Sequence, residues 1–173
     1  MTDLFEPLSF TRGPAMKNRF MLAPLTNTQS YDDGRLSDEE FRWLTMRAEG
    51  GFGLTMTCAA HVQAAGQGFP GQLGIFSNDH VEGLTRLSTA IKARDSIAVV
   101  QLHHAGMRSP EELIGEKPHC PSDNEEFGAR ALLTAEVDQL IEDFVAAAER
   151  AEKAGFDGVE LHGAHGYILC QFL

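Results

Sequence analysis

Apolar residues recur along the chain with two different spacings. Short apolar runs with the alternation or continuity of β-strands occupy residues 19–25, 53–58, 97–102 and 157–161. Between these runs lie longer segments in which apolar residues return every three or four positions, as they do in amphipathic helices. Strands that alternate with helices predict an α/β fold with a parallel sheet and right-handed crossovers.

Capping signals and apolar faces predict where three helices begin. The first follows a capping box, in which Ser37 and Glu40 satisfy each other's free amides, and it ends before Gly50. The second helix is predicted to be capped by Ser77 or Asn78. The third is predicted to begin with Thr134 as its N-cap. The last of them has the most regular apolar face of any segment in the chain.

The segments outside these elements decide between two α/β architectures. Residues 1–18 are predicted to form a small hairpin or plug, and residues 103–133 a long loop with one short helical turn. No Gly-x-Gly-x-x-Gly follows the first strand, where Pro24-Leu-Thr-Asn27 stands instead, which favours a (β/α)8 barrel over a Rossmann fold. We therefore predict that residues 1–173 form a single domain, the N-terminal half of a TIM barrel with about four βα units and a short N-terminal hairpin.

Composition and charge exclude several classes of function. A net charge of −11 argues against nucleic acid or an anionic membrane as partner, and no apolar run is long enough to span a bilayer. Cys58, Cys120 and Cys170 are odd in number and far apart, which argues against a disulfide framework or a structural zinc site. The N-terminus has no positive region followed by an apolar one, so the predicted compartment is the cytoplasm.

Polar side chains follow each predicted strand. In a barrel the carboxyl ends of all strands meet on one face, where the active site lies. The final strand is followed within six residues by His162, His165 and Tyr167, separated by small residues. Two imidazoles and a phenol are well suited to hold and protonate an oxygen atom. Gln101, in an apolar strand, is either a structural hydrogen-bonding group or a contact for a flat polar heterocycle.

A zinc site is the alternative for the two histidines. His-x-x-His supplies two nitrogen ligands, but a catalytic zinc needs a third protein ligand. The candidates for it are Cys170, Glu160 and the distant His103. Because few residues could supply this third ligand, zinc is the weaker alternative, and we predict no metal.

Five blocks of sequence carry a family resemblance: NRFMLAPLT (18–26), GIFSNDH (74–80), QLHHAG (101–106), PS (121–122) and AGFDGVELHGAHGYILCQFL (154–173). Together they resemble the Old Yellow Enzyme family of NADH:flavin oxidoreductases. The resemblance implies a (β/α)8 barrel that binds FMN, takes hydride from NADH or NADPH, and reduces the activated alkene of an enone.

The resemblance also implies roles for particular residues. His162 and His165 would donate hydrogen bonds to the enone carbonyl, and Tyr167 would give a proton to the α-carbon; fixed donors aimed at the developing enolate oxygen stabilise it strongly. Two positions depart from the family pattern. Thr28 stands where some members carry an aromatic residue, and Cys58 stands where others carry an acidic one. The implied FMN contacts are Ala23, Pro24, Leu25, Thr26, Ala59, Gln101 and His162.

The resemblance covers only the first half of a family barrel, which leaves two interpretations. In the first, the chain is the N-terminal half of an FMN-dependent ene-reductase, either truncated or completed by a second polypeptide. In the second, it is an inactive half-barrel that acts only in assembly or is a remnant. In both, the first and fourth strands would have free edges, so we expect self-association or binding of a C-terminal half-barrel chain. We also expect Phe20, Leu22, Leu54, Met56, Val99 or Val100, and Val159 to face inward.

Overall fold

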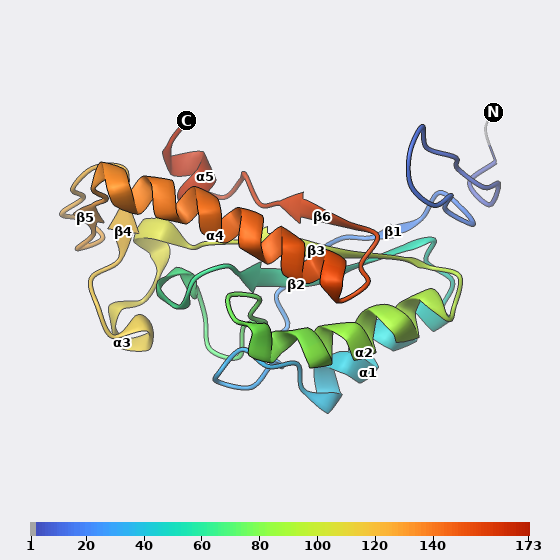
Figure 1. Cartoon of the computed structure of the whole chain (residues 1–173). Helices are drawn as coiled ribbons and strands as arrows, with labels where there is room; N and C mark the ends of the chain where they lie inside the picture. The colour runs from blue at the N-terminus through green and yellow to red at the C-terminus, as the bar shows by residue number, and fades with distance from the viewer. Residues whose placement is uncertain (1–2) are drawn as a thin grey trace.

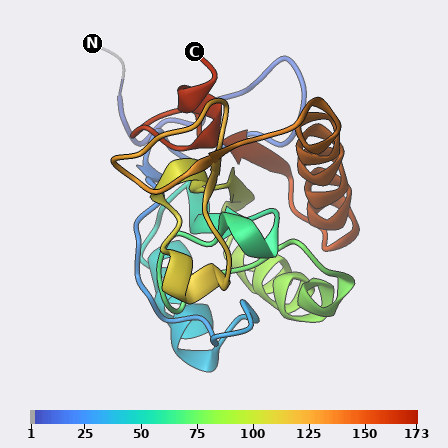
Figure 2. The ribbon, with the colours of Figure 1, turned by 90° about the vertical axis from the view of Figure 1, so that its left-hand side faces the viewer.

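The four predicted strands form one parallel sheet in the computed structural model, which describes residues 3–173 (Figure 1). Its order is β1-β2-β3-β6, with the strands at Met21–Leu22, Leu54–His61, Ile97–His103 and Gly158–Leu161. The connecting helices are α1 (Asp38–Glu49), α2 (Val81–Lys92) and α4 (Thr134–Lys153), and they cover one side of the sheet (Figures 1 and 2). The predicted α/β order is therefore confirmed.

Each side of the sheet has its own apolar core. The larger core lies between the sheet and the helices and contains Val100 and Leu102 of β3. The smaller core lies on the inner side, where Met56 and Val99 pack with Met16 of the N-terminal segment. That segment forms the predicted hairpin through paired backbone hydrogen bonds of 3.0 and 2.9 Å between Leu8 and Met16, while residues 1–2 lie outside the described part.

The register of the sheet corrects part of the predicted inward face. Successive side chains of a strand point to opposite sides, and registered partners in a parallel pair share a side. Val159 is registered with Val100, so it faces the helices, and Leu22 also belongs to the helix-side core. Gln101 is registered with Glu160, so these two polar residues face inward.

Two predicted segments differ in extent. The first strand is only two residues long instead of the predicted 19–25, because the backbone beyond Leu22 leaves the sheet before Pro24, which has no amide to donate. The predicted loop 103–133 holds more structure than one helical turn. It contains η3 (Gly106–Arg108), α3 (Glu111–Ile114) and the paired strands β4 (His119–Cys120) and β5 (Arg130–Ala131).

The remaining short elements complete the connections. The 3-10 turns η1 (Ala64–Gly66) and η2 (Asn78–His80) lie between β2 and α2, and α5 (Ile168–Gln171) follows β6. Ser77 accepts a hydrogen bond from Asp79 and so caps η2, which leads directly into α2. Thr134 is the first residue of α4 and not its cap. The Glu136 carboxylate instead accepts the free amide of Leu133, at 2.7 Å, because the bidentate ion pair with Arg130 holds it there.

The predicted capping box of α1 is only half formed. Ser37 Oγ accepts the amide of Glu40 at 3.1 Å, but the Glu40 side chain turns inward and is fully buried. Its carboxylate accepts hydrogen bonds from Asn27 Nδ2 at 3.0 Å, from Cys58 Sγ at 3.1 Å and from Ser30 Oγ. Burial, and then the Glu40 charge, raise the pKa of Cys58 well above its usual value, which keeps its thiol protonated as a donor. Glu40 thus ties the β1–α1 loop to β2.

We expect Glu40→Gln to lower the free energy of unfolding by about 2 kcal/mol, because an amide nitrogen would face donors that now bond a carboxylate. Glu39→Gln, at the exposed neighbouring position, is the matched control and should have little effect. Urea denaturation at a fixed chain concentration measures both. Equal losses in the two variants would show that the inward bonds of Glu40 contribute little.

Candidate active site

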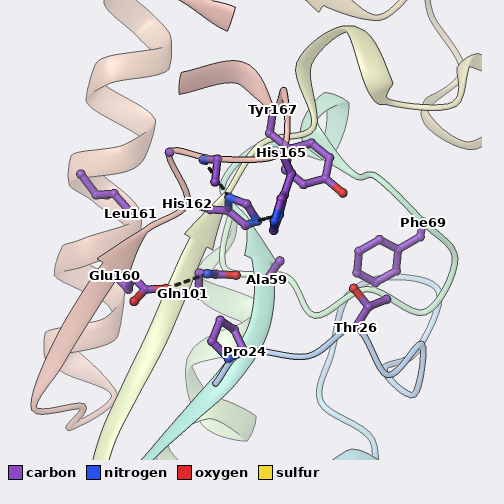
Figure 3. A pocket seen from close by; sticks show the side chains of 12 residues that line it. Pro24, Thr26, Ala59, Phe69, Gln101, Glu160, Leu161, His162, His165 and Tyr167 are labelled. Atoms are coloured by element: carbon purple, nitrogen blue, oxygen red, sulfur yellow. Dashed lines mark hydrogen bonds between the residues drawn. The ribbon is translucent and has the colours of Figure 1, made fainter. Parts of the chain in front are cut away.

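A pocket of about 250 Å³ opens at the carboxyl ends of the four strands (Figure 3). Each strand of the sheet, or the residues just after it, contributes to its wall. The row Ala59, Gln101 and Glu160 runs side by side across β2, β3 and β6 at its base. The lining residues are Pro24, Thr26, Ala59, Phe69, Gln101, Glu160, Leu161, His162, Gly163, Ala164, His165 and Tyr167.

Most residues predicted to form a site are brought together here. His162, His165 and Tyr167 line the pocket with four of the predicted cofactor contacts, Pro24, Thr26, Ala59 and Gln101. Ala23 and Leu25 do not line it and are exposed on either side of Pro24. The sequence analysis missed Phe69 as a lining residue and Glu160 as a partner of Gln101. For Glu160 the strand alternation was a usable signal, since it points away from Val159 and Leu161; for Phe69, in a glycine-rich connection, we see none.

The two histidines of the turn after β6 are hydrogen bonded to each other. His162 Nδ1 accepts the backbone amide of Ala164 at 3.3 Å, which assigns the proton of neutral His162 to Nε2. That N–H faces His165 Nδ1 at 3.3 Å, so His165 carries its own proton on Nε2 (Figure 3). Burial, and then the neighbouring His165, lower the pKa of His162, so it is a neutral donor near pH 7. The bond between the rings is long, and a better acceptor in the pocket would compete with it.

Tyr167 stands edge-on to the histidines around it. Its ring centroid lies 4.9 Å from that of His162 at 87° and 4.4 Å from that of His103 at 81°. Figure 3 shows its hydroxyl directed towards the side of the pocket formed by Phe69 and Thr26. A neutral donor and a phenol therefore border the same space.

His103 lies behind the pocket and not in its wall. It is 1% exposed, and its Nδ1 lies 3.0 Å from Gln72 Nε2, which also donates to the Ala59 carbonyl. The Gln72 nitrogen must therefore be a donor to Nδ1, and the proton of His103 is on Nε2. Burial lowers the pKa of His103 to about 3. His103 is thus a neutral, fixed ring that packs against Tyr167 and His162.

Gln101 is oriented by Glu160. Gln101 Nε2 donates to Glu160 Oε1 at 2.7 Å, a short bond of the kind formed with a charged acceptor. This bond fixes the amide and leaves its oxygen and one N–H free for a ligand. An amide held in this way can pair with a flat heterocycle that carries adjacent C=O and N–H groups.

The donor set fits the ring of a flavin better than it fits a metal. The free edge of the Gln101 amide and the small apolar side chains of Pro24 and Ala59 suit an isoalloxazine, whereas among residues 3–173 no lysine or arginine lines the pocket to bind a phosphate. Within residues 3–173, no group of three or more His, Cys, Asp or Glu side chains is placed to hold a metal ion. Two of the third ligands considered for zinc already have other partners: Glu160 accepts a hydrogen bond from Gln101, and His103 accepts one from Gln72.

Comparison with known proteins identifies the family. A family model described as NADH:flavin oxidoreductase / NADH oxidase matches residues 3–173. The chain belongs to this family. It is 40% identical to the probable NADH-dependent flavin oxidoreductase YqiG of Bacillus subtilis (strain 168), over 98% of this chain and 46% of that protein.

Solved structures of family members share the fold. An Old Yellow Enzyme homologue from Zymomonas mobilis matches with a TM-score of 0.88 and 31% identity, over 96% of this chain and 50% of that one. Morphinone reductase in complex with tetrahydroNAD matches with a TM-score of 0.91 and 29% identity, over 100% of this chain and 52% of that one. The predicted half-barrel is confirmed: the chain has the fold of the N-terminal half of an Old Yellow Enzyme barrel and spans about half the length of these relatives. Over residues 3–173, the helices lack the length and apolar character needed to cross a membrane.

Proposed function

We propose that this chain provides the substrate-activating half of an FMN-dependent ene-reductase that reduces the alkene of an α,β-unsaturated carbonyl compound. The observation that carries the proposal is the pocket in which His162, His165 and Tyr167 face the oriented amide of Gln101. Membership of the NADH:flavin oxidoreductase family supports it. We propose NADH or NADPH as the source of hydride and the cytoplasm as the compartment.

FMN, when bound, supplies the hydride that reaches the β-carbon. The residues of this chain hold the ring and the substrate. Gln101 would pair with the polar edge of the ring, Pro24, Thr26 and Ala59 would contact it, and Ala23 and Leu25 would flank this wall. His162, which lines the same pocket, would contact both the ring and the substrate.

The imidazoles bind the carbonyl oxygen of the enone. As found, His165 has its Nε2 proton free, whereas the Nε2 proton of His162 is directed at His165. A carbonyl oxygen between the rings accepts hydrogen bonds more strongly than His165 Nδ1 does at 3.3 Å. The Nε2–H groups of both histidines then donate to this oxygen. These donors stabilise the negative charge that develops on the oxygen, and Tyr167 delivers a proton to the α-carbon.

The partner of the chain is proposed from its exposed edge. At β6, Val159 and Leu161 face the helix side but are 40% and 58% exposed, and Val145 of α4 is 49% exposed beside them. Parallel strands are normally covered on both sides, so this edge favours association. We propose that a separate C-terminal half-barrel chain covers this edge, or that two copies of this chain associate through it. The alternative function is an inactive half-barrel that only assembles.

The proposal is tested by reconstitution. The chain is titrated with FMN alone and together with the C-terminal half of the Bacillus subtilis relative, and NADH-dependent reduction of cyclohexenone is then measured. We expect weak FMN binding by the chain alone, because a phosphate bound without charged partners loses roughly 1.5–3 kcal/mol per missing bond. The complemented assembly should bind FMN and reduce the enone.

The C-terminal half alone is the control for this experiment, and light scattering reports assembly. A complemented, monodisperse assembly that neither binds FMN nor reduces cyclohexenone would contradict the proposed function and favour the inactive half-barrel. Tight FMN binding by a monomer of this chain would contradict the requirement for a partner.

A further inference from the structure

The turn that carries the candidate catalytic residues has an unusual backbone. His165 and Gly166 both have left-handed conformations, with φ of +58° and +66°. Gly166 adopts this conformation freely, but the Cβ of His165 makes it unfavourable there. A residue stays in such a conformation only when surrounding contacts hold it.

Two side chains hold the carbonyl groups of these residues. Arg108 Nη1 donates to the carbonyl oxygen of His165 at 2.6 Å, and Gln171 Nε2 donates to that of Gly166 at 2.7 Å. The Arg108 guanidinium also lies over the Tyr167 ring, 5.7 Å from its centroid. The two peptide groups that follow His165, one on each side of the Gly166 Cα, are thus held through their carbonyls by side chains from outside the turn.

Both holding side chains belong to one hydrogen-bonded unit with η3. Gln171 Nε2 also donates to the Ala105 carbonyl at 3.3 Å, and its Oε1 accepts the amide of Met107 at 3.2 Å. A Cβ at Gly106 would collide with the Gln171 amide, so a glycine is needed for this close approach. Arg108 is the last residue of η3.

The unit is anchored to the end of β3 through His104. His104 is 2% exposed; its Nδ1 accepts the amide of Gly106 at 3.0 Å, its Nε2 lies 3.0 Å from Gln63 Oε1, and its carbonyl accepts the amide of Ile168 at 3.1 Å. Burial lowers the pKa of His104 to about 3, so its Nδ1 remains an acceptor. The same strand carries Gln101, three residues earlier. The turn and the wall of the pocket at Gln101 are therefore fixed to one strand.

We propose that Arg108 and Gln171 are positioning residues that hold the 163–167 turn, and with it His165 and Tyr167, in the orientation used for alkene reduction. Neither residue lines the pocket, so they act through the residues that do. The inference rests on the proposed function for its catalytic consequence, while the restraint of the turn is a property of this chain alone.

The first test measures the restraint without reference to activity. Hydrogen–deuterium exchange of the backbone amides of residues 163–168 is measured by mass spectrometry. The parent and variant full chains are compared, each in the assembly that it forms. Arg108→Met should raise exchange there about tenfold, because the His165 carbonyl loses the side-chain donor that holds it and the turn opens more often. Arg108→Lys, which keeps a cationic donor, should restore most of the protection. Arg12→Met, at an exposed arginine of the N-terminal segment, is the matched control.

The second test measures the consequence in the flavin-loaded assembly. Arg108→Met should slow alkene reduction at saturating substrate about tenfold, since small errors in the placement of reacting groups are costly. Flavin reduction by nicotinamide should change less than twofold, and Arg108→Lys should recover most of the rate.

The outcomes separate this inference from the proposed function. Unchanged exchange in Arg108→Met overturns the inference, and so does faster exchange with a normal rate of alkene reduction. If the parent assembly reduces no alkene, the proposed function fails, and exchange alone then decides whether Arg108 restrains the turn.

Discussion

Replacing Tyr167 with phenylalanine should slow alkene reduction by about 10²–10⁴-fold while flavin reduction by nicotinamide stays near normal, because a general acid contributes to its own step only. Phenylalanine keeps the edge-on contacts of the ring with His103 and His162 and removes only the hydroxyl. Stopped-flow traces of the two half-reactions, in the flavin-loaded assembly, measure the two steps separately.

The chain offers a matched control, since it has only one other tyrosine, Tyr31. Tyr31 is 56% exposed and lies outside the pocket. Tyr31→Phe should leave both half-reactions unchanged. If Tyr167→Phe slows both half-reactions equally, the hydroxyl acts on the flavin or on the fold and is not the proton donor.

The fold was predictable wherever local pattern and tertiary structure agree. The α4 helix has a regular apolar face, and β3 is a nearly continuous apolar run, so each was identified from its own residues. The errors arose where distant residues decide the outcome. Glu40 has the spacing of a capping box, yet its carboxylate is drawn inward by Asn27, Ser30 and Cys58. No local pattern carries that information.

The site was predictable to the extent that it is local in sequence. His162, His165 and Tyr167 lie in one turn, so their proximity needs no long-range contact. The pairing of Gln101 with Glu160 depends on the register of β3 with β6, and register also decides which side Val159 faces. Register is fixed by the whole sheet, and a shift of one residue would reverse every side chain.

The largest effect expected on stability is acid unfolding driven by buried histidines. His61, His103 and His104 are 1–2% exposed, and burial lowers their pKa values to about 4, 3 and 3. Nearby imidazoles lower them further; His103, for example, faces His162, His104 and His61. In the unfolded chain each titrates near 6.5. Between these values the unfolded state binds more protons, so the stability linked to these groups is fully present above pH 6.5 and is lost as the pH falls towards the folded-state values of about 4 and 3.

The expected slope is steep. Each buried histidine contributes up to about 1.4 kcal/mol per pH unit, so three together approach about 4 kcal/mol per unit. A typical domain has only about 5–15 kcal/mol of stability, and we therefore expect unfolding before pH 4. A carboxylate with a lowered pKa loses its contribution to stability at a lower pH than the histidines do. The Arg130 hydrogen bonds lower the pKa of Glu136 to about 2, so the stability linked to Glu136 is lost only below about pH 4.5. The interval from pH 6.5 to 4.5 thus reports mainly on the histidines.

Urea denaturation in steps of pH measures this slope, which gives the number of protons taken up on unfolding independently of the absolute stability. His104→Asn places an amide oxygen where Nδ1 accepts the amide of Gly106 and removes one titrating group. The variant should be less stable at pH 8, because the bond with Gln63 is lost, yet its slope between pH 6.5 and 4.5 should fall by about one third. A parent protein whose stability does not change over that interval would show that these histidines are protonated in the folded state or titrate alike in both states.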